Sequence, residues 1–146
     1  MTDLRKGIID FGDVVVTHNT TKEMLINLFG DELSKMSTDT DIKFLRSFYI
    51  DKTKFSVWFY FNKLYQLSSI KLSPHLDYSS EKWDRTGQQE ERRAFCDKWL
   101  YEQLGAPQRN LGGAEYVFDN LRISCVTHTD QHNGADAGYI VITYLR

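Results

Sequence analysis

The densest cluster of side chains that could do chemistry lies between residues 128 and 136. It contains two imidazoles and two carboxylates, on His128, Asp130, His132 and Asp136, and such groups are common metal ligands. Their spacing matches neither a zinc-protease helix nor a calcium loop. The segment also holds an Asn-Gly turn dipeptide where two strands must be joined. We therefore expect a solvated hairpin loop without a metal. The alternative is a small metal-dependent hydrolase or ligand-binding enzyme that uses this loop.

The other candidate catalytic groups have structural explanations. A nucleophilic thiol needs a base and an electropositive setting, but Cys96 and Cys125 lie in an apolar helical stripe and an apolar strand. Both are expected to be reduced core thiols, and the spacing leaves open a disulfide between them. The run 90–93, Glu-Glu-Arg-Arg, is typical of a solvated helix face. No serine elbow, P-loop or Rossmann pattern occurs. We expect no catalytic residue, no cofactor and no enzyme.

An alternating run of aromatic residues is the best candidate for a binding surface. Between 55 and 61, Phe or Val at odd positions alternates with Ser56, Trp58 and Tyr60. If the odd positions face the helices, the even positions point the other way, and Tyr49 can join them from the neighbouring strand. We predict that Tyr49, Trp58 and Tyr60 bind a partner, since exposed aromatic patches often mark protein interfaces. The alternative, which the sequence supports equally, is that a loop or residues 1–19 cover the patch.

Periodicity predicts the elements that carry these residues. A capping box at Thr20 and Glu23 precedes an apolar stripe, which predicts a helix over about 20–36. A second helix is expected over 79–105, where Gly105 and Pro107 stop it. Alternating patterns and turn signals predict strands over the remaining apolar segments: 14–16, 44–50, 55–61, 64–72, 121–127 and 139–145. Residues 115–118 are either a further short strand or part of the preceding loop.

These elements predict one α+β domain over 1–146. Two main helices would pack on one face of an antiparallel sheet of about five to six strands. MLINLFG (24–30) is similar to WLYEQLG (99–105), and YFNKL (60–64) to VFDNL (117–121). Both halves run helix first and then strands, as a degenerate duplication would.

Composition narrows the classes of protein. The 146 residues are 41% hydrophobic and 26% charged, as in globular domains, whereas the 14% aromatic content is high enough to supply an interface as well as a core. The net charge of −2 gives no general attraction to nucleic acid or anionic lipid. No signal peptide and no membrane-spanning segment is expected. We therefore expect a cytoplasmic protein with reduced cysteines.

Three segments resemble the small immunity-type proteins with which bacteria neutralise a paired toxin. They are FGDVVVTHNTTKEML, WFYFNKLYQLSSIKLS, and YIVITYLR, which follows a Trp-Leu…Leu-Gly-Ala-Pro helix stop. The resemblance implies a non-enzymatic protein that binds a toxin domain tightly and blocks its active site or a neighbouring surface. It carries over no partner-binding residue. Oligomerisation through the aromatic face is a further alternative, and the sequence defines neither the oligomeric state nor the partner's identity.

Overall fold

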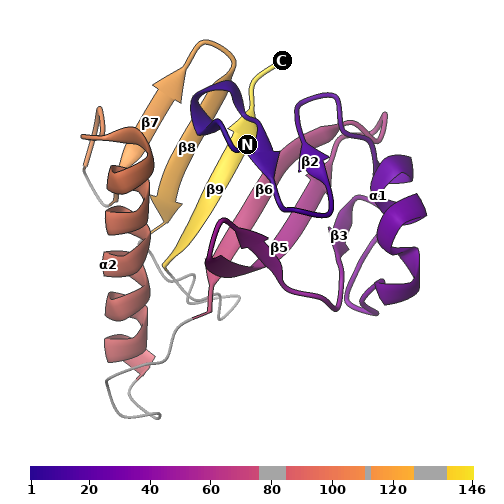
Figure 1. Cartoon of the computed structure of the whole chain (residues 1–146), viewed down its shortest axis with the longest axis horizontal. Coiled ribbons are helices and arrows are strands. Elements are labelled where there is room, and N and C mark those ends of the chain that lie inside the picture. The colour runs from indigo at the N-terminus through magenta and orange to yellow at the C-terminus, as the bar shows by residue number, and fades with distance from the viewer. Residues whose placement is uncertain (76–84, 111–112, 127–137) are drawn as a thin grey trace.

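A broad antiparallel sheet forms the body of the protein (Figure 1). The computed structural model describes residues 1–75, 85–110, 113–126 and 138–146. Within them the sheet has seven strands, in the order β3-β5-β6-β9-β8-β7, and β4 pairs with another part of β5. The strands are β3 (Asp41–Lys43), β4 (Phe48–Ile50), β5 (Thr53–Phe61), β6 (Leu67–Pro74), β7 (Glu115–Phe118), β8 (Leu121–Val126) and β9 (Tyr139–Tyr144).

Shorter elements surround this sheet. The chain begins with a 3-10 turn, η1 (Leu4–Lys6), and a two-stranded ribbon of β1 (Ile9–Asp10) and β2 (Val15–Val16). Helix α1 (Lys22–Phe29) continues into a second 3-10 turn, η2 (Gly30–Glu32), and helix α2 (Arg85–Leu104) precedes β7. None of the described helices combines the length and the apolar character needed to cross a bilayer.

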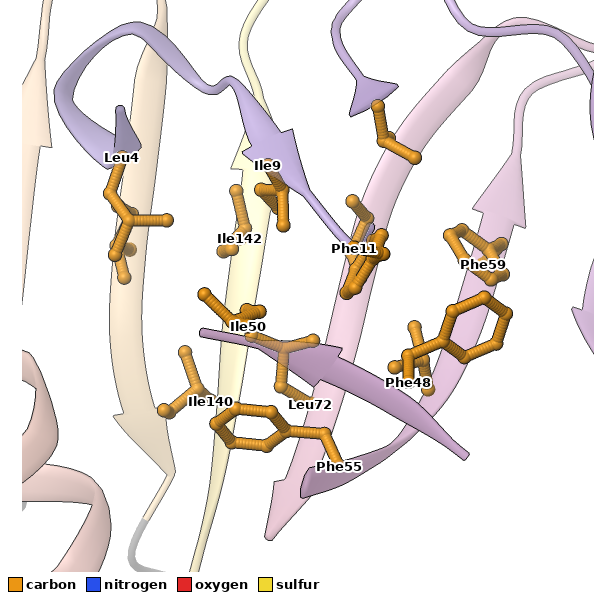
Figure 2. Packing of buried hydrophobic residues seen from close by; sticks show 14 of the residues in the cluster. Leu4, Ile9, Phe11, Phe48, Ile50, Phe55, Phe59, Leu72, Ile140 and Ile142 are labelled. Atoms are coloured by element: carbon orange, nitrogen blue, oxygen red, sulfur yellow. The ribbon is translucent and has the colours of Figure 1, made fainter. Parts of the chain in front are cut away.

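One face of the sheet is buried under these elements. On β5 the buried side chains are Phe55, Val57, Phe59 and Phe61, as the alternation predicts. They share one hydrophobic cluster with the N-terminal segment and both helices. In Figure 2, Ile9 and Phe11 lie over the sheet beside Ile142 and Phe59, and the strand that carries Phe48 and Ile50 crosses over it. Extended chain therefore covers much of this face.

The predicted fold class is wrong in its helices and in its number of strands. Two main helices on a five- to six-stranded sheet were expected, but the sheet has seven described strands and α1 has only eight residues. β4 and the N-terminal segment supply the cover that a long first helix would have given, because Phe11 and Phe48 are buried against the sheet. The two halves are also not equivalent, since α2 has twenty residues, so the duplication is not seen.

Helix α1 is shorter than its apolar stripe predicts. The helix was expected over 20–36 but ends at Phe29. Leu25 and Phe29 are buried and Ile26 packs against the core, whereas Met24, Leu28 and Met36 of the predicted stripe are exposed. Its cap is also shifted by one residue. The Thr21 hydroxyl accepts a hydrogen bond from the Met24 amide at 3.3 Å, whereas Thr20 accepts one from the Thr17 amide.

The outer edge of the sheet at β7 is occupied by the segment that precedes the strand. The Gln108 side chain donates to the Val117 carbonyl at 2.8 Å and accepts from the Val117 amide at 3.2 Å. The Glu115 amide donates to the Arg109 carbonyl at 2.9 Å. The backbone groups of β7 that face away from β8 are therefore largely satisfied within the chain.

Helix α2 docks closely on the residue that precedes β9. Gly138 has φ +87°, a conformation that side chains rarely adopt. A Cβ placed on it would lie 2.5 Å from the Arg92 Cβ and 3.0 Å from the Arg93 amide nitrogen, both in α2. The absence of a side chain at this position therefore sets how near the helix comes to the sheet.

We predict that Gly138→Ala destabilises the fold far more than Gly12→Ala. Gly12 is a matched control, because its φ is +89° and nothing lies within 4 Å of the point that a Cβ there would occupy. In both variants, backbone strain lowers the free energy of unfolding by about 1–2 kcal/mol. The alanine at 138 must in addition displace α2, at a further cost of about 1–3 kcal/mol. Urea unfolding measures both, and equal losses would contradict the close docking.

Candidate functional site

The side chains on the second face of β5 lie where the alternation predicts. Trp58 pairs with Lys43 of β3 on one side and with Lys71 of β6 on the other. The Trp58 and Tyr60 rings stack with their centroids 6.3 Å apart and their planes 17° from parallel. Both are partly buried, and the described elements that cover the sheet pack on the opposite face. The pair is therefore held in a fixed arrangement and remains partly accessible.

A third aromatic ring joins this surface from a distant part of the sequence. Tyr139 begins β9, which pairs with β6, and the Lys71 ammonium lies 4.3 Å from the centre of its ring. This distance allows a cation–π interaction. We call the surface formed by Lys43, Trp58, Tyr60, Lys71 and Tyr139 the open face. It alternates aromatic rings with cations.

The structure does not bring Tyr49 to this pair. β4 pairs Tyr49 with Lys54, which lies four residues before Trp58 and therefore about 13 Å away along the strand. Tyr49 is 49% exposed and lies in β4, which pairs with the first residues of β5. The open face as observed gains Tyr139 and two lysines and leaves Tyr49 outside. The other prediction, that residues 1–19 cover the aromatic patch, does not match either, because the buried residues of that segment pack on the opposite face.

The Tyr60 hydroxyl stays protonated at physiological pH. Burial raises the pKa of Tyr60, and the negative charges of Asp41 and of an ionised Tyr139 add to the effect. A neutral phenol can both donate and accept a hydrogen bond. Tyr60 can therefore offer a directed polar contact at the edge of an apolar surface.

A serine–histidine contact lies nearer the start of β5 than the stacked rings of Trp58 and Tyr60. The Ser56 Oγ and the His75 Nε2 are 2.6 Å apart. Burial lowers the pKa of His75, and the positive charges of Lys54 and Lys43 lower it further. A neutral imidazole at this distance could act as a base toward the hydroxyl. Within the described residues, however, no carboxylate pairs with His75, so the third member of a catalytic triad is not seen there.

We predict that His75 titrates below 6.5, the usual pKa of histidine. Between the folded and unfolded pKa values the unfolded chain binds more protons, so stability falls as the pH drops below about 6.5. NMR titration of the imidazole protons measures the midpoint. Lys54→Gln should move it upward, whereas Lys63→Gln, in a distant turn, should leave it unchanged. A wild-type midpoint at or above 6.5 would contradict the lowered pKa.

The other sequence candidates offer no site in the described part of the chain. His128, Asp130, His132 and Asp136 lie outside the described residues, so the metal-loop alternative stays a prediction. Elsewhere in the described ranges, no three His, Cys, Asp or Glu side chains gather as metal ligands would. In the run 90–93, Glu90 is exposed and the other three residues are partly buried, so the run is partly solvated.

Both cysteines are buried and neither forms a disulfide. Hydrogen bonding with the Cys96 thiol raises the pKa of Cys125, and burial raises it further. A thiol in this state is a poor nucleophile, because the thiolate is the reactive form. The placement of both residues agrees with the core role that their apolar surroundings indicate.

Comparison with known proteins adds little to this geometry. No family model matches the chain, and no curated protein matches it significantly. Among solved structures it is similar to a DUF4309 family protein, YjgB, from Bacillus subtilis, with 18% identity and a TM-score of 0.48. The alignment covers 88% of this chain and 81% of that one. A similarity this low carries no argument about function.

Proposed function

We propose that this protein is a non-enzymatic binding module whose open face docks on a partner protein. The observation that carries the proposal is the stacked pair of Trp58 and Tyr60 on a sheet face that no described helix covers. Tryptophan and tyrosine are enriched among residues that dominate interface energies. Their rings are already held together by stacking, so binding orders few further torsions.

The charges around the pair indicate the chemistry of the partner. Lys43 and Lys71 flank Trp58 in the cross-strand register, and Asp41 is the single acidic residue paired with this part of β5. A surface with an apolar centre and carboxylates around it would complement this arrangement. We therefore propose a partner that presents acidic side chains around an exposed hydrophobic group.

The partner we favour is a bacterial toxin domain, which the protein would neutralise by covering its active site or a neighbouring surface. The resemblance of three segments to immunity-type proteins supports this choice. We also propose a cytoplasmic location, supported by two cysteines that are free rather than paired in a disulfide.

We predict that the double variant Trp58→Ala, Tyr60→Ala folds but loses its partner. Tagged wild-type protein should recover one stoichiometric protein from native lysate, with a Kd below about 1 µM. Removing the ring pair should weaken binding at least about 30-fold, since even one interface residue of this kind contributes about 2 kcal/mol or more. Calorimetry with the recovered partner measures the change, and thermal unfolding checks the fold.

Tyr101→Ala is the matched control for this experiment. Tyr101 is 60% exposed on α2, so its removal should leave the affinity within about twofold. Co-expression with a toxic domain encoded beside this gene tests neutralisation, and wild type but not the double variant should restore growth. If the double variant unfolds, or binds as wild type does, the open face is not the docking site.

A further inference from the structure

A second surface, which shares no residue with the open face, has the features of an anion site. A hollow of about 670 Å³ lies between η1, the β7–β8 turn and the end of β9. Figure 1 shows the N-terminal turn, this turn and the end of the chain at the same end of the sheet. The charged and imidazole side chains that line the hollow are Arg5, Lys6, His18, Asp119 and Arg146.

The backbone around the hollow is fixed by contacts between distant segments. The buried Tyr144 hydroxyl donates to the Gly7 carbonyl at 2.8 Å, which ties the end of β9 to the turn that carries Arg5 and Lys6. The Leu145 amide donates to the Asn120 carbonyl at 2.9 Å and so ties the same strand to the β7–β8 turn. The cationic side chains therefore start from a rigid frame.

Both arginines are positioned without being neutralised. Arg5 donates to the Leu104 carbonyl at 2.9 Å and lies over the Phe118 ring at 5.7 Å. Arg146 donates to the carbonyls of His18 and Leu67 at 2.5 and 2.6 Å. Within the described residues, neither guanidinium pairs with a carboxylate side chain. Arg46 differs, because its guanidinium pairs with the carboxylates of Asp13 and Glu32, each 2.6 Å away.

We propose that the hollow binds the phosphate group of a small phosphate monoester. Three residues with permanent positive charge line the hollow, against the single carboxylate side chain of Asp119, so the charge of the lining is complementary to an anion. Guanidinium groups keep unused donors that suit the oxygen atoms of phosphate. The hollow is larger than one ion needs and falls in the range of small-ligand pockets. Phe118 and Leu121, which also line it, supply an apolar wall for the organic part of the ester.

The test uses phenyl phosphate and inorganic phosphate as probes, at ionic strength matched with sodium chloride. NMR amide shifts should saturate for residues 5–7, 118–121 and 144–146, and phenyl phosphate should bind more tightly than inorganic phosphate. Lys6→Glu should weaken binding about tenfold by reversing one charge at the site. Lys6 is exposed, so unchanged signals elsewhere will confirm that the variant folds.

The control is Lys63→Glu, which reverses an exposed charge in the turn between β5 and β6 and should leave the affinity within about twofold. Arg5→Lys keeps the charge but removes the forked donor, and should weaken phenyl phosphate binding several-fold. Shifts that do not saturate, or that chloride reproduces, overturn the proposal. Equal affinity for phenyl phosphate and inorganic phosphate also overturns the proposal, because it would indicate that the ligand is free phosphate and not a monoester. Binding of an oligonucleotide or a glutamate-rich peptide more than tenfold tighter than phenyl phosphate would also overturn the small-ligand assignment.

Discussion

The fold depends on a cluster of phenylalanine rings in edge-to-face contact. Its members come from five different segments and have centroids 5.1–6.5 Å apart: Phe11, Phe29, Phe44, Phe48 and Phe59. Each such pair contributes about 0.5–1.5 kcal/mol beyond the area it buries. Through these contacts the N-terminal segment, α1 and β4 are all held on the same side of β5. These covering elements therefore all pack on the buried face of the sheet.

The side chains that stabilise the fold are therefore different from those that we propose for binding. The buried face holds the large apolar side chains, while the open face and the hollow carry charged and aromatic groups that the core does not need. The two surfaces also differ in how their cations are held. On the open face Lys71 packs on the Tyr139 ring, whereas in the hollow the guanidinium groups are fixed by backbone carbonyls. The first arrangement suits an extended protein surface, and the second suits a compact oxyanion.

Local sequence patterns predicted which face of the sheet a side chain lies on, but they did not predict which distant residues lie next to it. The alternation along 55–61 placed Trp58 and Tyr60 correctly, because the period of a strand is set by its own backbone. It could not indicate that β9 pairs with β6 and brings Tyr139 to the same surface, since that pairing joins residues about seventy positions apart. The hollow was missed for the same reason: Arg5 and Arg146 lie at opposite ends of the sequence and share no motif. Helix α1 was overestimated because a helical apolar spacing does not require a buried partner.

The side chain of Gln108 has a consequence for how other chains can associate with this one. Through the Val117 backbone it occupies hydrogen-bonding positions that an incoming strand would use, and free positions of this kind promote sheet-to-sheet aggregation. A foreign strand would have to displace the amide of Gln108 before it could extend the sheet beyond β7. These two hydrogen bonds disfavour strand addition at the β7 edge, both by copies of the same chain and by a partner. At this edge they favour recognition through side chains over recognition through backbone pairing.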